Sequence, residues 1–224
     1  MEQTGTQPAA VVMTKKDTAF STVAGAIIGL LAMPVLKAAK PDLYETINIW
    51  LVPFFIIGTP FGLYVAHLLS KRLVFLWQFA KFFVTGIMNA LVDLGVLAML
   101  TFAFRQYLGI KASDIILSIG FAITFYSIYK SVSFIISNVN SYYWNKYWTF
   151  HKEGDSQTSE FAKFFIVSII GFIINVVVAS LVFGVGHSIT ALSSDQWGLI
   201  GAASGSVAGL LWNFIGYKFL VFKR

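Results

Sequence analysis

The sequence predicts an all-α, polytopic membrane protein with six transmembrane helices. Apolar residues make up 57% of the 224 residues, and charged residues make up only 12%. Six apolar runs come close to the roughly 20 residues that a helix needs to cross a bilayer. The last four runs form two similar pairs, so the predicted fold class includes a parallel duplication of a helix pair.

The first two runs form a hairpin that stands apart from the repeated pairs. We expect residues 1–17 to be a polar cytoplasmic tail and residues 18–73 to be an extra transmembrane hairpin. A Lys-Lys pair precedes the first run, as in a secretory signal, but no small-residue cleavage site follows. We therefore expect a retained helix, with a cleaved or re-entrant segment as the alternative. Pro53 and Pro60 interrupt the second run, where neighbouring groups must satisfy the freed carbonyls.

The following runs repeat one helix pair. The string QFAKFFVTGIMNALVD begins at Gln78, and the similar string EFAKFFIVSIIGFIIN begins at Glu160. A Ser-Asp dipeptide, typical of a helix start, opens the second helix of each pair at Ser113 and at Ser194. The fourth helix is accordingly expected over the apolar run 115–139. The predicted ranges are 74–224 for a four-helix domain, 74–150 for its first repeat and 160–224 for its second.

The fifth and sixth helices are expected over the apolar runs 161–185 and 199–222. Gly201, Gly205 and Gly209 recur every four residues along the sixth helix, with small neighbours beside them. Such spacing is typical of closely packed membrane helices, and we favour this interpretation over a ligand site. Similar spacings occur in the first hairpin. The glycine faces are also candidate contacts in a homo-oligomer.

The basic residues predict the orientation of the helices. If six helices alternate, 11 of the 16 Lys and Arg residues fall on one side, four on the other, and Lys130 inside the membrane. The positive-inside rule therefore places both termini in the cytoplasm and predicts a multi-pass protein of the cell membrane. The net charge of +6 without any basic block indicates contact with anionic membrane lipids and not with nucleic acid.

Two charged residues lie inside predicted transmembrane helices. Asp93 follows Lys81 by 12 residues, which places it about 18 Å into a hydrocarbon core about 30 Å thick. Intramembrane charges normally face a partner or a wet cavity and indicate a functional site. Lys130 is the second such residue, and an Asp93–Lys130 pair is one interpretation. In the alternative, Lys130 reaches the headgroups and Asp93 is either stabilised by Asn89, one turn earlier, or protonated.

Other polar residues complete the predicted substrate-binding site. Two serines and an asparagine share one face of the fourth helix with Lys130. Three further lysines recur near the predicted cytoplasmic face, where ammonium groups suit a lipid phosphate, and two asparagines near helix ends could bond a sugar or phosphate. Ordinary positive-inside topology and helix capping are the alternatives. The candidates are Lys81, Asn89, Asp93, Lys130, Ser133, Ser137, Asn140, Asn145, Lys146, Asn213 and Lys218.

The repeat also resembles a known family. The pattern FAKFFVTGIMNALVD, with Gly86, Asn89 and Asp93, is followed by a helix that ends in NKYWTF, and this combination is similar to the GtrA-like family of small four-helix membrane proteins. The second pair fits through AKFF from Ala162 and through its YKFLVF ending. The resemblance covers residues 74–224. It implies a role in moving or handling polyprenyl-phosphate-linked sugars, as a flippase or as the membrane partner of a glycosyltransferase.

Missing motifs argue against an enzyme. The chain has no glycine-rich lysine loop for nucleotide phosphates and no Asp-x-Asp motif for a metal and a nucleotide sugar. Its three histidines are far apart, and the lack of cysteine excludes disulfides, iron–sulfur clusters and thiolate zinc. We therefore expect no catalytic residue, no metal and no cofactor.

Three functions are compatible with these features. The first is translocation, or flipping, of a polyprenyl-phosphate-linked sugar for the synthesis of cell-envelope polysaccharide or glycan. In this mechanism Asp93 would meet sugar hydroxyls and Lys130 would meet the phosphate. The second is a non-transporting membrane anchor of a glycosyltransferase. The third is a small proton-coupled exporter with Asp93 as its proton site, and the residues alone do not separate these functions.

Overall fold

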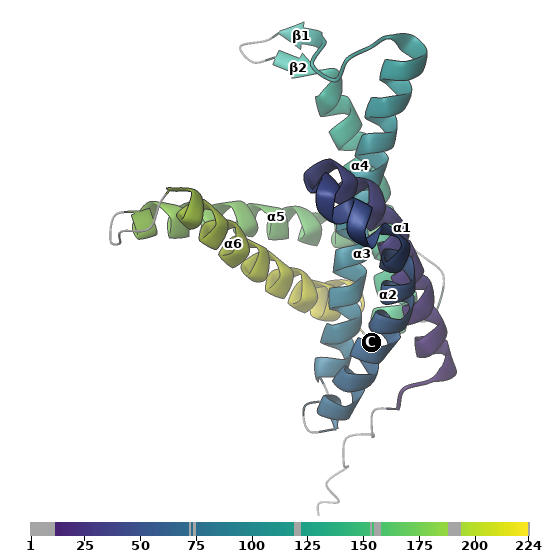
Figure 1. Ribbon diagram of the computed structural model, residues 1–224. Coiled ribbons are helices and arrows are strands. Elements are labelled where there is room, and N and C mark those ends of the chain that lie inside the picture. The colour runs from purple at the N-terminus through teal and green to yellow at the C-terminus, as the bar shows by residue number, and fades with distance from the viewer. Residues whose placement is uncertain are drawn as a thin grey trace, which may run out of the picture. The chain divides into compact units, whose positions relative to one another are not determined.

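The computed structural model (Figure 1) describes residues 12–71, 73, 75–118, 122–152, 154, 158–187 and 194–223. These residues form six α-helices, two short π-helices and one pair of strands. In chain order the elements are α1 (Lys15–Ala39), α2 (Pro41–Ser70), α3 (Phe75–Leu108), β1 (Ile115–Ser118), β2 (Ala122–Thr124), α4 (Phe125–Trp144), η1 (Asn145–Thr149), α5 (Thr158–His187), α6 (Ser194–Gly216) and η2 (Tyr217–Val221). The all-α fold class with six helices is thus confirmed, apart from the strand pair.

Four of the helices are long and apolar enough to cross a membrane. These candidate spans are Lys15–Lys37, Pro41–Ser70, Phe75–Leu108 and Thr158–Val185. Helix α4 is less apolar than these spans, because it carries Lys130 with several Ser and Asn side chains. That all six helices cross the membrane, and that the pairs arose by duplication, stays a prediction.

The chain packs into two compact units, Met1–Thr149 and Phe150–Arg224. The first unit contains the extra hairpin as well as the first helix pair, and the second contains α5, α6 and η2. The helical hairpin of α1 and α2, which the sequence separates from the repeats, therefore packs in the same unit as α3 and α4.

Within the first unit, α1 lies against both α2 and α3. Gly29 permits the contact with α2, because a Cβ at this position would lie 2.8 Å from a backbone Cα of α2. Along α3, the contacts of α1 run from Asp17 beside Lys81 to Leu31 beside Gly95. The helices α1 and α3 are therefore parallel, and α1 follows α3 over four turns.

The helices α3 and α4 run antiparallel. The ring of Phe104, near the end of α3, is 4.9 Å from the ring of Tyr129 near the start of α4. At the opposite end, Trp77 of α3 belongs to the same apolar cluster as Trp148 of η1. Phe20 of α1 stacks on Trp148 with ring centroids 6.0 Å apart. Aromatic side chains from α1, α3 and η1 therefore close this end of the first unit.

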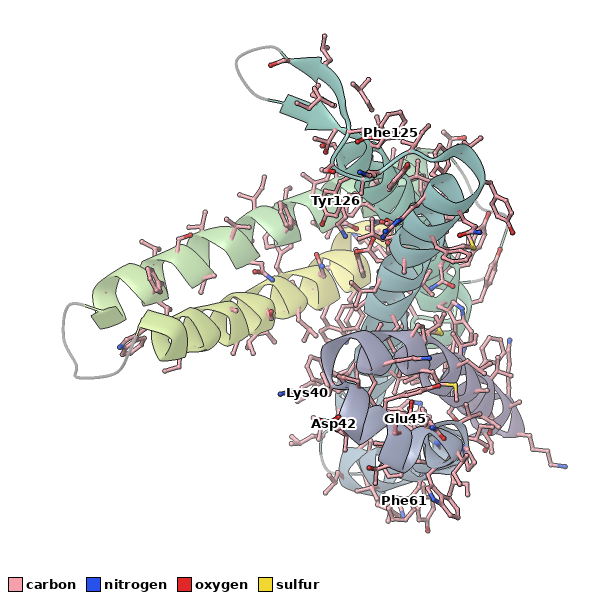
Figure 2. The ribbon with its side chains drawn as sticks, turned by 45° about the horizontal axis from the view of Figure 1, so that its top comes forward. Lys40, Asp42, Glu45, Phe61, Phe125 and Tyr126 are labelled. Atoms are coloured by element: carbon pink, nitrogen blue, oxygen red, sulfur yellow. The ribbon has the colours of Figure 1, made fainter. Side chains whose placement is uncertain are left out.

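The expected start of the fourth helix is wrong. The backbone N–H of Lys111 donates to Asp114 Oδ2 at 2.8 Å, so the Ser-Asp dipeptide closes a turn and does not begin a helix. An antiparallel hairpin of β1 and β2 follows, and α4 begins only at Phe125, ten residues into the run 115–139. Figure 2 shows Phe125 and Tyr126 next to this hairpin. Consecutive β-branched residues favour a strand here, a preference that apolar periodicity alone does not reveal.

In the second unit, α5 and α6 pack closely along the predicted glycine face. A Cβ at Gly201 would lie 2.6 Å from the carbonyl oxygen of Ala179, and one at Gly209 would lie 2.8 Å from that of Gly171. The predicted packing role of these glycines is confirmed. Because α5 occupies this face, the interpretation of the α6 glycines as contacts between copies of the chain is wrong.

Candidate functional site

Asp93 lies at the centre of a polar cluster between α3 and α4. Its Oδ2 accepts a hydrogen bond from Lys130 Nζ, and its Oδ1 accepts one from Ser133 Oγ at 2.6 Å. The side chain of Asp93 is 20% exposed and that of Lys130 is 41% exposed. The structure thus contains the Asp93–Lys130 ion pair, one of the two arrangements that the sequence left open. Their role in binding a substrate stays a prediction.

The pair gives Asp93 a partner in a segment where an isolated charge would be costly. Asp93 lies within the candidate span Phe75–Leu108, about 18 Å along the helix from Lys81. Removing a charge from water is favourable only when partners replace its hydration, and Asp93 receives an ammonium and a hydroxyl. The side chain of Lys130 is partly exposed, so a ligand can approach it from outside the helix pair.

Polar side chains recur every four residues on the facing sides of α3 and α4. This spacing places them on one face of each helix. Because the helices are antiparallel and Asp93 bonds to Ser133, each of these polar residues on α3 is expected to lie level with one on α4 or η1. We call these residues the polar seam: Lys81, Thr85, Asn89 and Asp93 on α3, with Ser133, Ser137, Ser141 and Asn145 on α4 and η1.

Most of the polar seam is enclosed by protein. The side chains of Thr85 and Ser133 are fully buried, and those of Ser137, Ser141 and Asn145 are nearly so. Sequence reasoning missed two members, Thr85 and Ser141, because single hydroxyl residues are common in membrane helices. The four-residue spacing back from Asp93 and forward from Ser133 was a signal that could have found them.

One end of the polar seam carries a second ion pair, which the sequence did not predict. Lys81 Nζ lies 3.2 Å from Asp17 Oδ1, and both residues are buried. Asp17 belongs to the capping box of α1, where its Oδ2 accepts hydrogen bonds from the N–H of Thr14 at 3.0 Å and from Thr14 Oγ1 at 2.7 Å. The Lys81 ammonium is also 5.0 Å from the ring of Trp77.

This ion pair changes the interpretation of Lys81. The sequence placed its ammonium group at the cytoplasmic interface, where it would be free to meet a lipid phosphate. The structure instead encloses it between α1 and α3, opposite Asp17. Thr14-x-x-Asp17 is a recognisable capping pattern, but nothing local in it indicates a partner 64 residues away.

The remaining predicted residues of the first unit lie on or beside the polar seam. Asn145 donates from Nδ2 to the carbonyl oxygen of Ser141 at 2.8 Å. Lys146 is fully buried, with its Nζ 3.5 Å from Tyr142 Oη. Asn89 Oδ1 and Asn140 Nδ2 are buried and have no hydrogen-bond partner among the residues that the structure describes.

Asn213 and Lys218 belong to the second unit. The Asn213 side chain lies where a Cβ at Gly171 of α5 would be. Lys218 Nζ lies 5.5 Å from the ring centroid of Phe219. Lys218 is the second residue of η2, and Lys146 is likewise the second residue of η1. That these two residues join the same site as Asp93 stays a prediction. In the described part of the chain, no group of three or more His, Asp or Glu side chains could hold a metal ion.

The comparison with known families shows the family of the chain. Residues 81–222 match the family model described as "GtrA/DPMS, transmembrane domain". The chain belongs to this family. The expected resemblance is thereby confirmed, and the match contains the whole polar seam, whereas α1 and α2 lie outside it. Members of the family are membrane proteins linked to the handling of polyprenyl-phosphate sugars.

A curated relative supports the membrane assignment without adding a function. The chain is 25% identical over 142 residues to the "Uncharacterized membrane protein YngA" of Bacillus subtilis (strain 168). The aligned part covers 63% of this chain and 77% of the relative. No solved structure matches the chain.

Proposed function

We propose that the chain translocates a polyprenyl-phosphate-linked sugar across the cell membrane for the synthesis of cell-envelope polysaccharide or glycan. The observation that carries this proposal is the cluster that Asp93, inside the candidate span Phe75–Leu108, forms with Lys130 and Ser133 of α4. The family links the chain to sugars of this class. A translocator of a charged, hydroxylated headgroup needs polar partners at this depth.

The chemistry of the cluster suits both parts of such a headgroup. A carboxylate accepts hydrogen bonds from sugar hydroxyls, and a Lys ammonium binds phosphate as a point charge. In the free chain the two groups satisfy each other. When the substrate binds, the phosphate takes the place of Asp93 at Lys130 while hydroxyl groups donate to Asp93, so neither charge is left without a partner. The polyprenyl tail stays in the lipid, and the partly exposed side chain of Lys130 leaves room for the phosphate to approach.

The proposal includes six membrane-spanning helices with both termini in the cytoplasm and a parallel duplication of the helix pair over residues 74–224. Two features support the duplication. Each helix pair ends in a π-helix, η1 or η2, and each π-helix has a lysine at its second position, Lys146 or Lys218. Because π-helices are rare and often occur at functional sites, their recurrence at matched positions favours a shared origin and role.

Liposomes that contain the purified chain test the proposal. A fluorescent polyprenyl-phosphate sugar is placed in one leaflet, and its appearance in the other is followed with an impermeant quencher. Asp93→Asn and Lys130→Gln should each slow transport about tenfold or more, because a lost charged hydrogen bond removes about 1.5–3 kcal/mol. Asp42→Asn and Lys40→Gln, at exposed positions labelled in Figure 2, are the matched controls. Equal rates for all variants would refute the assignment.

The strand hairpin favours a second function, a non-transporting membrane partner of a glycosyltransferase. A two-stranded sheet has open hydrogen-bonding edges on both sides and is marginally stable alone. Ile115 and Leu117 in β1 are also at least half exposed. A partner chain could pair with such an edge. This function predicts that a glycosyltransferase co-purifies with the chain and that the isolated chain moves no lipid.

A further inference from the structure

The polar seam has hydrogen-bonding capacity that α3 and α4 do not use on each other. Thr85 donates from Oγ1 to the carbonyl oxygen of Lys81 at 3.0 Å, and Ser137 donates to that of Phe134 at 3.0 Å, so each hydroxyl bonds within its own helix. Polar side chains that join membrane helices typically bond across the interface. In the described residues, the buried Oδ1 of Asn89 has no partner at all.

An ion pair lies at one end of the polar seam, and an aromatic cluster lies at the other. At the Lys81 end, Asp17 binds the ammonium group, and Phe20, one turn later on α1, covers Trp148. Beyond Asp93, the rings of Phe104, Phe125 and Tyr129 pack together with centroids 4.9 to 6.4 Å apart. The seam is therefore a polar strip about 18 Å long between an ion pair and an aromatic cluster.

The two ends differ in chemistry. The aromatic cluster offers no charge to a ligand, and Asp93 and Lys130 beside it are partly exposed. The Asp17 carboxylate is an anion that lies 3.2 Å from the buried ammonium group of Lys81. A lipid phosphate is also an anion that a Lys ammonium can bind. Asp17 comes from α1, outside the residues that match the family model.

We propose that the polar seam is a wet route for the sugar-phosphate headgroup between the Lys81 end and Asp93, and that Asp17 is the gate residue that closes it. This inference rests on the proposed function. The incoming phosphate displaces the Asp17 carboxylate from Lys81, and the sugar hydroxyls then bond to Thr85, Asn89 and Ser137. Successive levels of the seam are about 6 Å apart, so a hydroxylated headgroup can reach one level before it leaves the previous one.

Thiol labelling tests the route, because the natural chain has no cysteine and a single substitution gives the only signal. Thr85→Cys and Ser137→Cys report on the seam. Ile87→Cys and Ile136→Cys, on the exposed faces of the same helices, are the matched controls. Proteoliposomes are treated with a charged, membrane-impermeant methanethiosulfonate. The seam thiols should react about tenfold or more faster than the controls, because only a wet thiol forms the reactive thiolate.

The gate is tested by combining Thr85→Cys with substitutions at Asp17. Asp17→Asn removes the charge but keeps an oxygen for the α1 cap, and it should raise the labelling rate several-fold. Asp17→Glu keeps the charge and should leave the rate equal to that of Thr85→Cys alone. Gel filtration of each variant shows whether the fold is retained. Equal labelling of seam and control thiols, or equal rates for Asp17→Asn and Asp17→Glu, would overturn the inference.

The outcome also separates this inference from the proposed function. Addition of a polyprenyl-phosphate sugar should slow labelling at Thr85→Cys, because the headgroup occupies the seam. If the wild-type chain moves the lipid while the seam thiols react no faster than the controls, the route is wrong and the function stands. If the seam is wet and opens with Asp17→Asn but no lipid is moved and none protects, the route and gate are supported and the cargo is wrong.

Discussion

The Asp17–Lys81 ion pair provides a direct test of how α1 docks onto the family domain. Asp17→Asn removes the carboxylate charge and leaves the Lys81 ammonium buried without it. The two side chains are 2% and 0% exposed, so solvent cannot compensate for the loss. Breaking a buried pair in this way costs about 3–5 kcal/mol of stability. The cap of α1 is worth about 0.5–2 kcal/mol and is kept, since an Asn oxygen also accepts hydrogen bonds.

A double-mutant cycle separates the pair from other effects. Lys81→Met should also cost about 3 kcal/mol, because Asp17 is then left charged and buried. The double variant should lose about 3 kcal/mol less than the sum of the single variants, because no uncompensated charge remains. Unfolding of the purified chain by detergent titration, followed through its helical signal, gives the free energies.

The exposed Asp42 supplies the matched control for this cycle. Asp42→Asn should change stability by about 0.5 kcal/mol or less. The reasoning is refuted if Asp17→Asn costs no more than this control, or if the effects at Asp17 and Lys81 are additive.

Two further predictions concern the site and the second unit. Ser133→Ala should slow lipid transport and lower the free energy of unfolding by about 1.5–3 kcal/mol, because Asp93 loses a charged hydrogen bond. Ser131→Ala, on the exposed side of α4, should change neither the transport rate nor the stability. Equal effects of the two variants in the transport and unfolding assays would contradict this prediction. Gly205→Val should lower stability by about 1–3 kcal/mol, because the new side chain forces α5 and α6 apart. Gly58→Val should be nearly neutral in thermal unfolding, because a Cβ at this position would meet no atom of another described element within 4 Å.

The sequence predicted the part of the site that consists of charged residues inside apolar helices. A carboxylate and an ammonium inside apolar helices need partners, so a pair of Asp93 and Lys130 could be proposed although the two residues are 37 positions apart in the chain. Whether the two heights match depends on where α4 begins. That point was misjudged, because an apolar run fits a strand as well as a helix.

The pairing of Lys81 shows what local patterns leave out. Its position near the start of an apolar helix is typical of an interfacial lysine, and most such residues face headgroups. The structure buries it because α1 lies parallel to α3 and brings Asp17 to the same level. No periodicity in either helix encodes that contact, since the direction of one helix relative to another is set by the packing of both.

The sequence by itself determined that this is a helical membrane protein of the GtrA/DPMS family, because composition, run length and a repeated motif are properties of the chain read locally. It also determined which residues carry charge into apolar helices. The tertiary structure decided which of those charges meet. The antiparallel register of α3 and α4 joins Asp93 to Lys130 and aligns the polar seam, and the docking of α1 encloses Lys81. Contacts between distant segments depend on how whole helix surfaces fit, and that fit exists only in the folded chain.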